Sequence, residues 1–79
     1  MGVLHRIGKA TIRVYANDHL PPHFHVTAPD SEALIEIATL EVLRGSLPQG
    51  RTGHAILKWA REHRDHIVAE WKRTNNFPA

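Results

Sequence analysis

Cysteine is absent from the 79 residues of this chain. Without it no disulfide can form, and a metal ion has only histidine and carboxylate ligands available to it. This composition is typical of a reducing compartment, and we expect a cytoplasmic protein. A chain of this length forms one domain, over residues 1–79. Its core is small, so a protein partner or a second copy is expected to add stability.

Long apolar runs are also missing. No stretch approaches the length of a membrane span, and the opening residues MGVLHRIGK lack the apolar core of a secretion signal. Arg6 occupies the position where a myristoylation motif requires serine or threonine. We therefore expect a protein that does not associate with membranes.

Neither sign of charge is in clear excess. Ten lysine and arginine residues oppose eight aspartate and glutamate residues, which gives a formal net charge of +2. That charge permits contact with nucleic acid but does not argue for it. The chain also lacks a glycine-rich phosphate loop and a recognisable nucleophile arrangement. These absences weigh against nucleotide-dependent and acyl-transfer chemistry.

Short runs rich in Val, Ile, Thr and Tyr fill the first half of the chain. Turn residues separate them, Gly8 with Lys9 in the first pair and Pro29 with Asp30 in the second. The runs are residues 3–7, 10–16, 23–28 and 32–38, with 40–44 as a short fifth candidate. They predict an antiparallel meander of four strands, or five if the last run pairs.

One long C-terminal helix is predicted over about residues 52–74, after the loop GSLPQGRTG. Side chains recur along it at spacings of three and four, which predicts one stripe packed on the sheet. The stripe consists of Ile56, Ala60, His63, Ile67 and Trp71, with Trp59 beside it. The expected fold class is α+β, an antiparallel sheet covered by one long helix.

The segment NDHLPPHFHV, residues 17–26, holds three of the seven histidines. Alternate side chains of a strand share a face, so His23 and His25 are expected on an open face, with Phe24 and Val26 in the core. Two imidazoles at this spacing can share one ion, and the stiff Pro-Pro pair directs His19 toward them.

Three interpretations of these histidines stay open. The first is a metal site, for zinc as an example, made by His19, His23 and His25 with Asp18 in support. The second is acid–base chemistry without a metal, and the third is a purely structural role. The spacing matches no established zinc motif, so the pattern does not decide among them.

Three further residues are candidates for the same site. Arg13 and Tyr15 lie on a neighbouring predicted strand and can supply an anion clamp and a phenol donor, although both types also serve as ordinary surface packing. His63 interrupts the apolar stripe, where a buried neutral imidazole bonded to a carbonyl is more usual than a ligand. If His63 faces the core, it cannot meet His23 and His25 without a sheet edge or a bulge.

These motifs resemble a family of small prokaryotic proteins known as domain of unknown function four-one-six-zero. The resemblance rests on IRVYANDHLPPHFHV, EALIEI, GSLP and the run from Trp59 to Trp71, and it covers nearly the whole chain. It implies a stand-alone domain with genes near toxin–antitoxin-like cassettes, and it implies no established reaction. The family positions are Asp18, His19, Pro21, Pro22, His23, Phe24, His25, His63 and Trp71.

Two functions follow as hypotheses. The first is a binding or regulatory module that acts through a protein partner or a second copy, favoured because no complete catalytic set is present. The second is a histidine-based or metal-dependent hydrolase, for example a ribonuclease. In it His19, His23 and His25 hold or replace the metal, and Arg13 engages phosphate.

Overall fold

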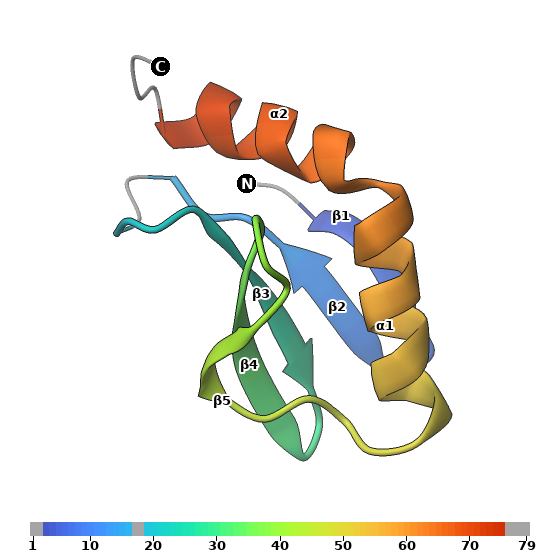
Figure 1. Ribbon diagram of the computed structural model, residues 1–79. Helices are drawn as coiled ribbons and strands as arrows, with labels where there is room; N and C mark the ends of the chain where they lie inside the picture. The colour runs from blue at the N-terminus through green and yellow to red at the C-terminus, as the bar shows by residue number, and fades with distance from the viewer. Residues whose placement is uncertain (1–2, 17–18, 76–79) are drawn as a thin grey trace.

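Five strands form one antiparallel sheet in the computed structural model, which describes residues 3–16 and 19–75 (Figure 1). The strands are β1 Val3–Ile7, β2 Ala10–Arg13, β3 His23–Ala28, β4 Ser31–Glu36 and β5 Val42–Gly45. Each pairs with the next one along the chain. The predicted meander is confirmed, and the short fifth candidate is a strand.

Alternation along the strands separates an apolar face from a mixed one. Ile12, Val26 and Ala33 pair across β2, β3 and β4, and all three are fully buried. The neighbouring row on the other face contains Arg13 and His25, both half-buried. The core therefore lies on one side of the sheet, as the period of two predicts.

The predicted helical span is confirmed, and it is divided into two helices at His63. The first is α1 Arg51–Glu62 and the second is α2 Arg64–Asn75. At His63 the backbone departs from helical geometry, with φ at −119°. The carbonyl oxygen of Trp59 accepts hydrogen bonds from both the backbone N–H and the ring Nδ1 of His63, each at 2.9 Å. The ring thus adds a second hydrogen bond to a carbonyl that already accepts the regular backbone bond.

The break at His63 lets the two helices pack against different parts of the sheet. Figure 1 shows α1 beside β1 and β2, whereas α2 runs across the end of the sheet where β2 ends and β3 begins. In agreement, α1 contacts β1 and α2 contacts β3. Neither helix, within the residues that the structure describes, is long and apolar enough to cross a membrane.

The predicted apolar stripe is confirmed at four of its positions and wrong at one. Ile56, Ala60, Ile67 and Trp71 are buried, but His63 is exposed. The local break turns the His63 ring back toward the carbonyl of Trp59, away from the core. Regular periodicity places a side chain correctly only while the helix stays regular.

Candidate functional site

Four rings stand in series at the end of the sheet that α2 crosses. The ring of Tyr15 meets the ring of His25 edge-on with centroids 4.5 Å apart. The His25 ring lies 5.1 Å from that of His23, which lies 5.2 Å from that of Trp71. We call these residues the His23 cluster. They join the loop after β2, the strand β3 and the helix α2 through side chains that are distant in sequence.

His23 is buried, with only 3% of its surface exposed. Its Nδ1 lies 2.8 Å from the carbonyl oxygen of Pro21. A carbonyl oxygen can only accept, so Nδ1 carries the hydrogen and a neutral ring presents its lone pair at Nε2. The carbonyl of Pro22 accepts from the backbone N–H of Ile37 at 3.1 Å, which anchors this segment to the end of β4.

The sheet face that carries His23 and His25, which was expected to be exposed to solvent, is only partly exposed. His25 is half-buried and lies in the same cross-strand row as Arg13. His23 points to the same side of β3 but is covered, so the prediction of an exposed His23 is wrong. Because α2 extends across the sheet end, Trp71 closes over a ring that strand alternation alone leaves outside.

The proposed metal ligands are not all within the described structure. His19 is exposed, whereas Asp18 lies outside the described residues. Within residues 3–16 and 19–75, no three histidine, aspartate or glutamate side chains are grouped so that they could hold a metal ion. Zinc binding by His19, His23 and His25 with Asp18 in support therefore stays a prediction.

Arg13 pairs with His25 across β2 and β3, whereas Tyr15, predicted on the same strand as Arg13, lies in the loop after β2 and supplies one ring of the His23 cluster. The Nε of Arg13 is buried and has no hydrogen-bond partner among the residues described. Tyr15 keeps 41% of its surface exposed, and its backbone carbonyl accepts a hydrogen bond from Nδ2 of Asn75 at 3.1 Å.

Asn75 was not predicted from the sequence as a functional or structural residue, although it continues the buried stripe four residues beyond Trp71. It is the buried polar group that ties α2 to the loop after β2.

His63 belongs to a second group of rings. It stacks on Trp59 with centroids 4.9 Å apart, and His5 stacks on the same indole at 4.8 Å. The bond from Nδ1 of His63 to a carbonyl agrees with the sequence prediction, but its expected burial does not. The described ring contacts thus assign His63 to α1 and β1, away from the His23 cluster.

An apolar hollow of about 400 Å³ adjoins the His23 cluster and shares Trp71 with it. We call it the Trp71 hollow; its lining consists of Pro22, Ile37, Ala38, Arg64, Val68, Trp71 and Lys72. Ile37 and Trp71 are buried, whereas Pro22 and Lys72 are exposed. Both charged residues of the lining are cations, and Nε of Arg64 donates to the carbonyl of Ile37 at 3.0 Å. The hollow is therefore apolar inside and positively charged at its rim.

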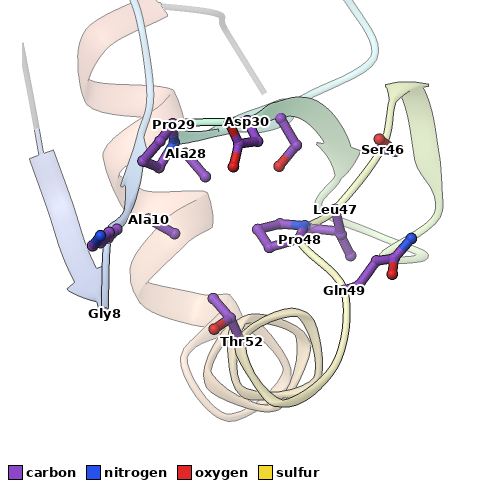
Figure 2. A pocket seen from close by; sticks show the side chains of 12 residues that line it. Gly8, Ala10, Ala28, Pro29, Asp30, Ser46, Leu47, Pro48, Gln49 and Thr52 are labelled. Atoms are coloured by element: carbon purple, nitrogen blue, oxygen red, sulfur yellow. The ribbon is translucent and has the colours of Figure 1, made fainter.

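A larger cavity of about 670 Å³ lies at the opposite end of the sheet (Figure 2). The turn after β1, the turn after β3 and the loop between β5 and α1 enclose it. We call it the turn-end cavity. None of the family positions named from the sequence lines it.

A family model described as Domain of unknown function (DUF4160) matches residues 10–72. The match runs from β2 into α2 and contains the His23 cluster and the whole lining of the Trp71 hollow. The resemblance inferred from the motifs is confirmed. Searches of curated proteins and of solved structures each returned no match.

Proposed function

The chain belongs to the family described as Domain of unknown function (DUF4160), and we propose that it is a binding module that holds an apolar side chain of a protein partner in the Trp71 hollow. One observation carries this proposal. Pro22 and Trp71, both among the family positions, line a hollow that is apolar inside and bordered by Arg64 and Lys72. Partners commonly bind through an apolar anchor in a well-packed pocket with charges at its rim.

The rim indicates the chemistry of the partner. Arg64 is already held by its bond to the carbonyl of Ile37, so little side-chain entropy is lost when an anion approaches it. Lys72 supplies a second cation from the next turns of α2. The best match is a segment in which an apolar side chain stands among aspartate or glutamate residues. Such a segment can belong to the other protein of a toxin–antitoxin-like cassette, which would make this module its regulator.

The approach to β3 adds exposed apolar surface. Leu20 exposes 62% of its surface, and Pro21 and Pro22 after it are also exposed. Prolines lose little conformational freedom when bound, because their φ angle is set in advance. This segment supports a surface that meets a partner at small entropic cost.

The hydrolase alternative has less support from the geometry. His23 is buried against Trp71, and its Nδ1 is bonded to the backbone. A metal ligand or a general base needs access to the reacting atoms. The observed contacts favour packing and positioning as the role of this residue.

A peptide display selection on the untagged domain tests the proposal. We expect enrichment of peptides with a central leucine, phenylalanine or tryptophan flanked by glutamate or aspartate. Titration of an enriched peptide should shift the indole N–H signal of Trp71 and leave that of Trp59 unchanged. The two tryptophans of the chain thus report on the hollow and on a site outside it.

Charge reversal supplies the matched control. Lys72→Glu should lower the affinity for the acidic peptide by roughly tenfold, since it replaces an attraction at the rim of the hollow by a repulsion. Lys58→Glu makes the same change at an exposed position on α1 outside the hollow and should have little effect. Equal weakening by both variants, or no enriched acidic peptide, would refute the proposed site.

A further inference from the structure

The turn-end cavity has the size of a small-molecule site. Its volume of about 670 Å³ lies within the range of roughly 300–1,000 Å³ that such sites occupy. Figure 2 shows side chains from the start of β2, from the turn after β3 and from the loop before α1 around one space. No part of the proposed partner surface contributes to it.

The loop that forms one wall is fixed at both ends by close backbone approaches. A β-carbon on Gly45 would collide with the carbonyl oxygen of Glu32, and the N–H of Ser46 donates to that oxygen at 3.0 Å. A β-carbon on Gly53 would likewise collide with the carbonyl oxygen of Pro48. The wall is thus held against the sheet at one end and against α1 at the other. A cavity formed in advance reduces the ordering that a ligand must impose.

Opposite charges line this cavity without neutralising each other. Lys9 and Asp30 belong to adjacent hairpin turns, and both are exposed. Neither takes part in an ion pair within residues 3–16 and 19–75. Gln49 and Thr52 add an amide and a hydroxyl, and Ala10 provides a buried apolar floor.

We propose that the turn-end cavity binds a small zwitterion of the free α-amino acid class. Its carboxylate pairs with Lys9 and its ammonium group with Asp30, while its side chain rests on the apolar lining. A ligand with only an anionic group would be repelled by Asp30, and one with only a cationic group by Lys9. A divalent cation would be attracted by Asp30 alone and repelled by the ammonium group of Lys9.

A leucine series tests the charge requirement directly. The probes are free L-leucine, N-acetyl-leucine with only the carboxylate, leucine amide with only the ammonium group, and N-acetyl-leucine amide with neither. Two-dimensional NMR should show free leucine shifting the side-chain amide of Gln49 with a Kd on the order of 1 mM or tighter. We expect each blocked analogue to bind at least tenfold more weakly.

Neutral variants of the two charged residues complete the test. Lys9→Gln and Asp30→Asn should each lower the affinity for free leucine at least tenfold. Lys58→Gln and Asp65→Asn make the same changes outside the cavity and should leave binding unchanged. Each spectrum reports at once whether its variant is folded. The proposal is overturned if leucine causes no shift at Gln49 or if the blocked analogues bind as well as free leucine. It is also overturned if the control variants lower the affinity for leucine as much as the cavity variants do. Because Trp71 reports separately on its own hollow, this result is independent of the proposed function.

Discussion

The ring of His23 lies 5.2 Å from the ring of Trp71, and this contact joins the start of β3 to α2. His23 is buried and donates from Nδ1 to the carbonyl of Pro21, so one side chain connects the Pro-Pro segment, the sheet and the helix. The Trp71 hollow depends on this junction, because Trp71 and Pro22, the residue before His23, both belong to its lining.

We predict that the donor nitrogen of His23 matters more to stability than the ring itself. His23→Ala removes a buried hydrogen bond and should lower the free energy of unfolding by about 1–3 kcal/mol. His23→Asn should lower it less, since the asparagine amide can donate from nearly the position of Nδ1. Urea denaturation followed by tryptophan fluorescence measures both. Equal losses in the two variants would contradict a structural role for this hydrogen bond.

Two glycines with positive φ should respond differently to alanine. Gly8 has φ at 57° with open space around a built β-carbon, so Gly8→Ala should cost only the left-handed strain of about 1–2 kcal/mol. Gly45 has φ at 77°, and its β-carbon would collide with the carbonyl of Glu32. Gly45→Ala should therefore lower the melting temperature clearly more than Gly8→Ala. A similar decrease in both would show that β5 can shift away from β4.

Glu70 should titrate at lower pH than an ordinary glutamate. The hydrogen bond from Arg73, together with the positive charge of Arg73, lowers the pKa of this carboxyl below its usual 4.5. A lowered pKa means that the carboxylate stabilises the fold at neutral pH, and that this contribution disappears as the pH falls through the folded pKa. The contribution is small, since water screens the exposed guanidinium.

Arg73→Gln is the direct check of that pH dependence. NMR titration should find the pKa of Glu70 raised toward its ordinary value in this variant. Lys72→Gln removes a neighbouring positive charge that makes no ion pair with Glu70 and should change the pKa much less. If the wild type and Arg73→Gln titrate alike, the ion pair on the surface of α2 is absent in solution.

The zinc site predicted from the sequence has its own test. If His19, His23 and His25 bind one ion, calorimetric titration of the untagged protein should show zinc uptake that His25→Ala abolishes. His54→Ala removes an exposed histidine of α1 and should leave the uptake intact. Circular dichroism confirms that both variants fold. No uptake by the wild type, or equal uptake by the two variants, would return the three histidines to a structural role.

Local patterns in the chain were sufficient to predict much of the architecture. The alternation of Phe24 and Val26 with His25, and the turn chemistry around Gly8 and Pro29, predicted the strands and their buried face correctly. The family could also be named from motifs. These features depend on neighbouring residues, whose geometry repeats every two positions in a strand and about every 3.6 in a helix.

The burial of His23, the exposure of His63 and both cavities could not be predicted in this way. The burial of His23 and the Trp71 hollow depend on where α2 lies, and the exposure of His63 depends on the break between the two helices. The turn-end cavity depends on how two hairpin turns meet the loop before α1. Once the helix is broken, Trp71 reaches over the sheet end and Asn75 bonds to the carbonyl of Tyr15, sixty residues away in sequence. No local period encodes contacts between segments so far apart, because they arise only when the packed layers bring them together.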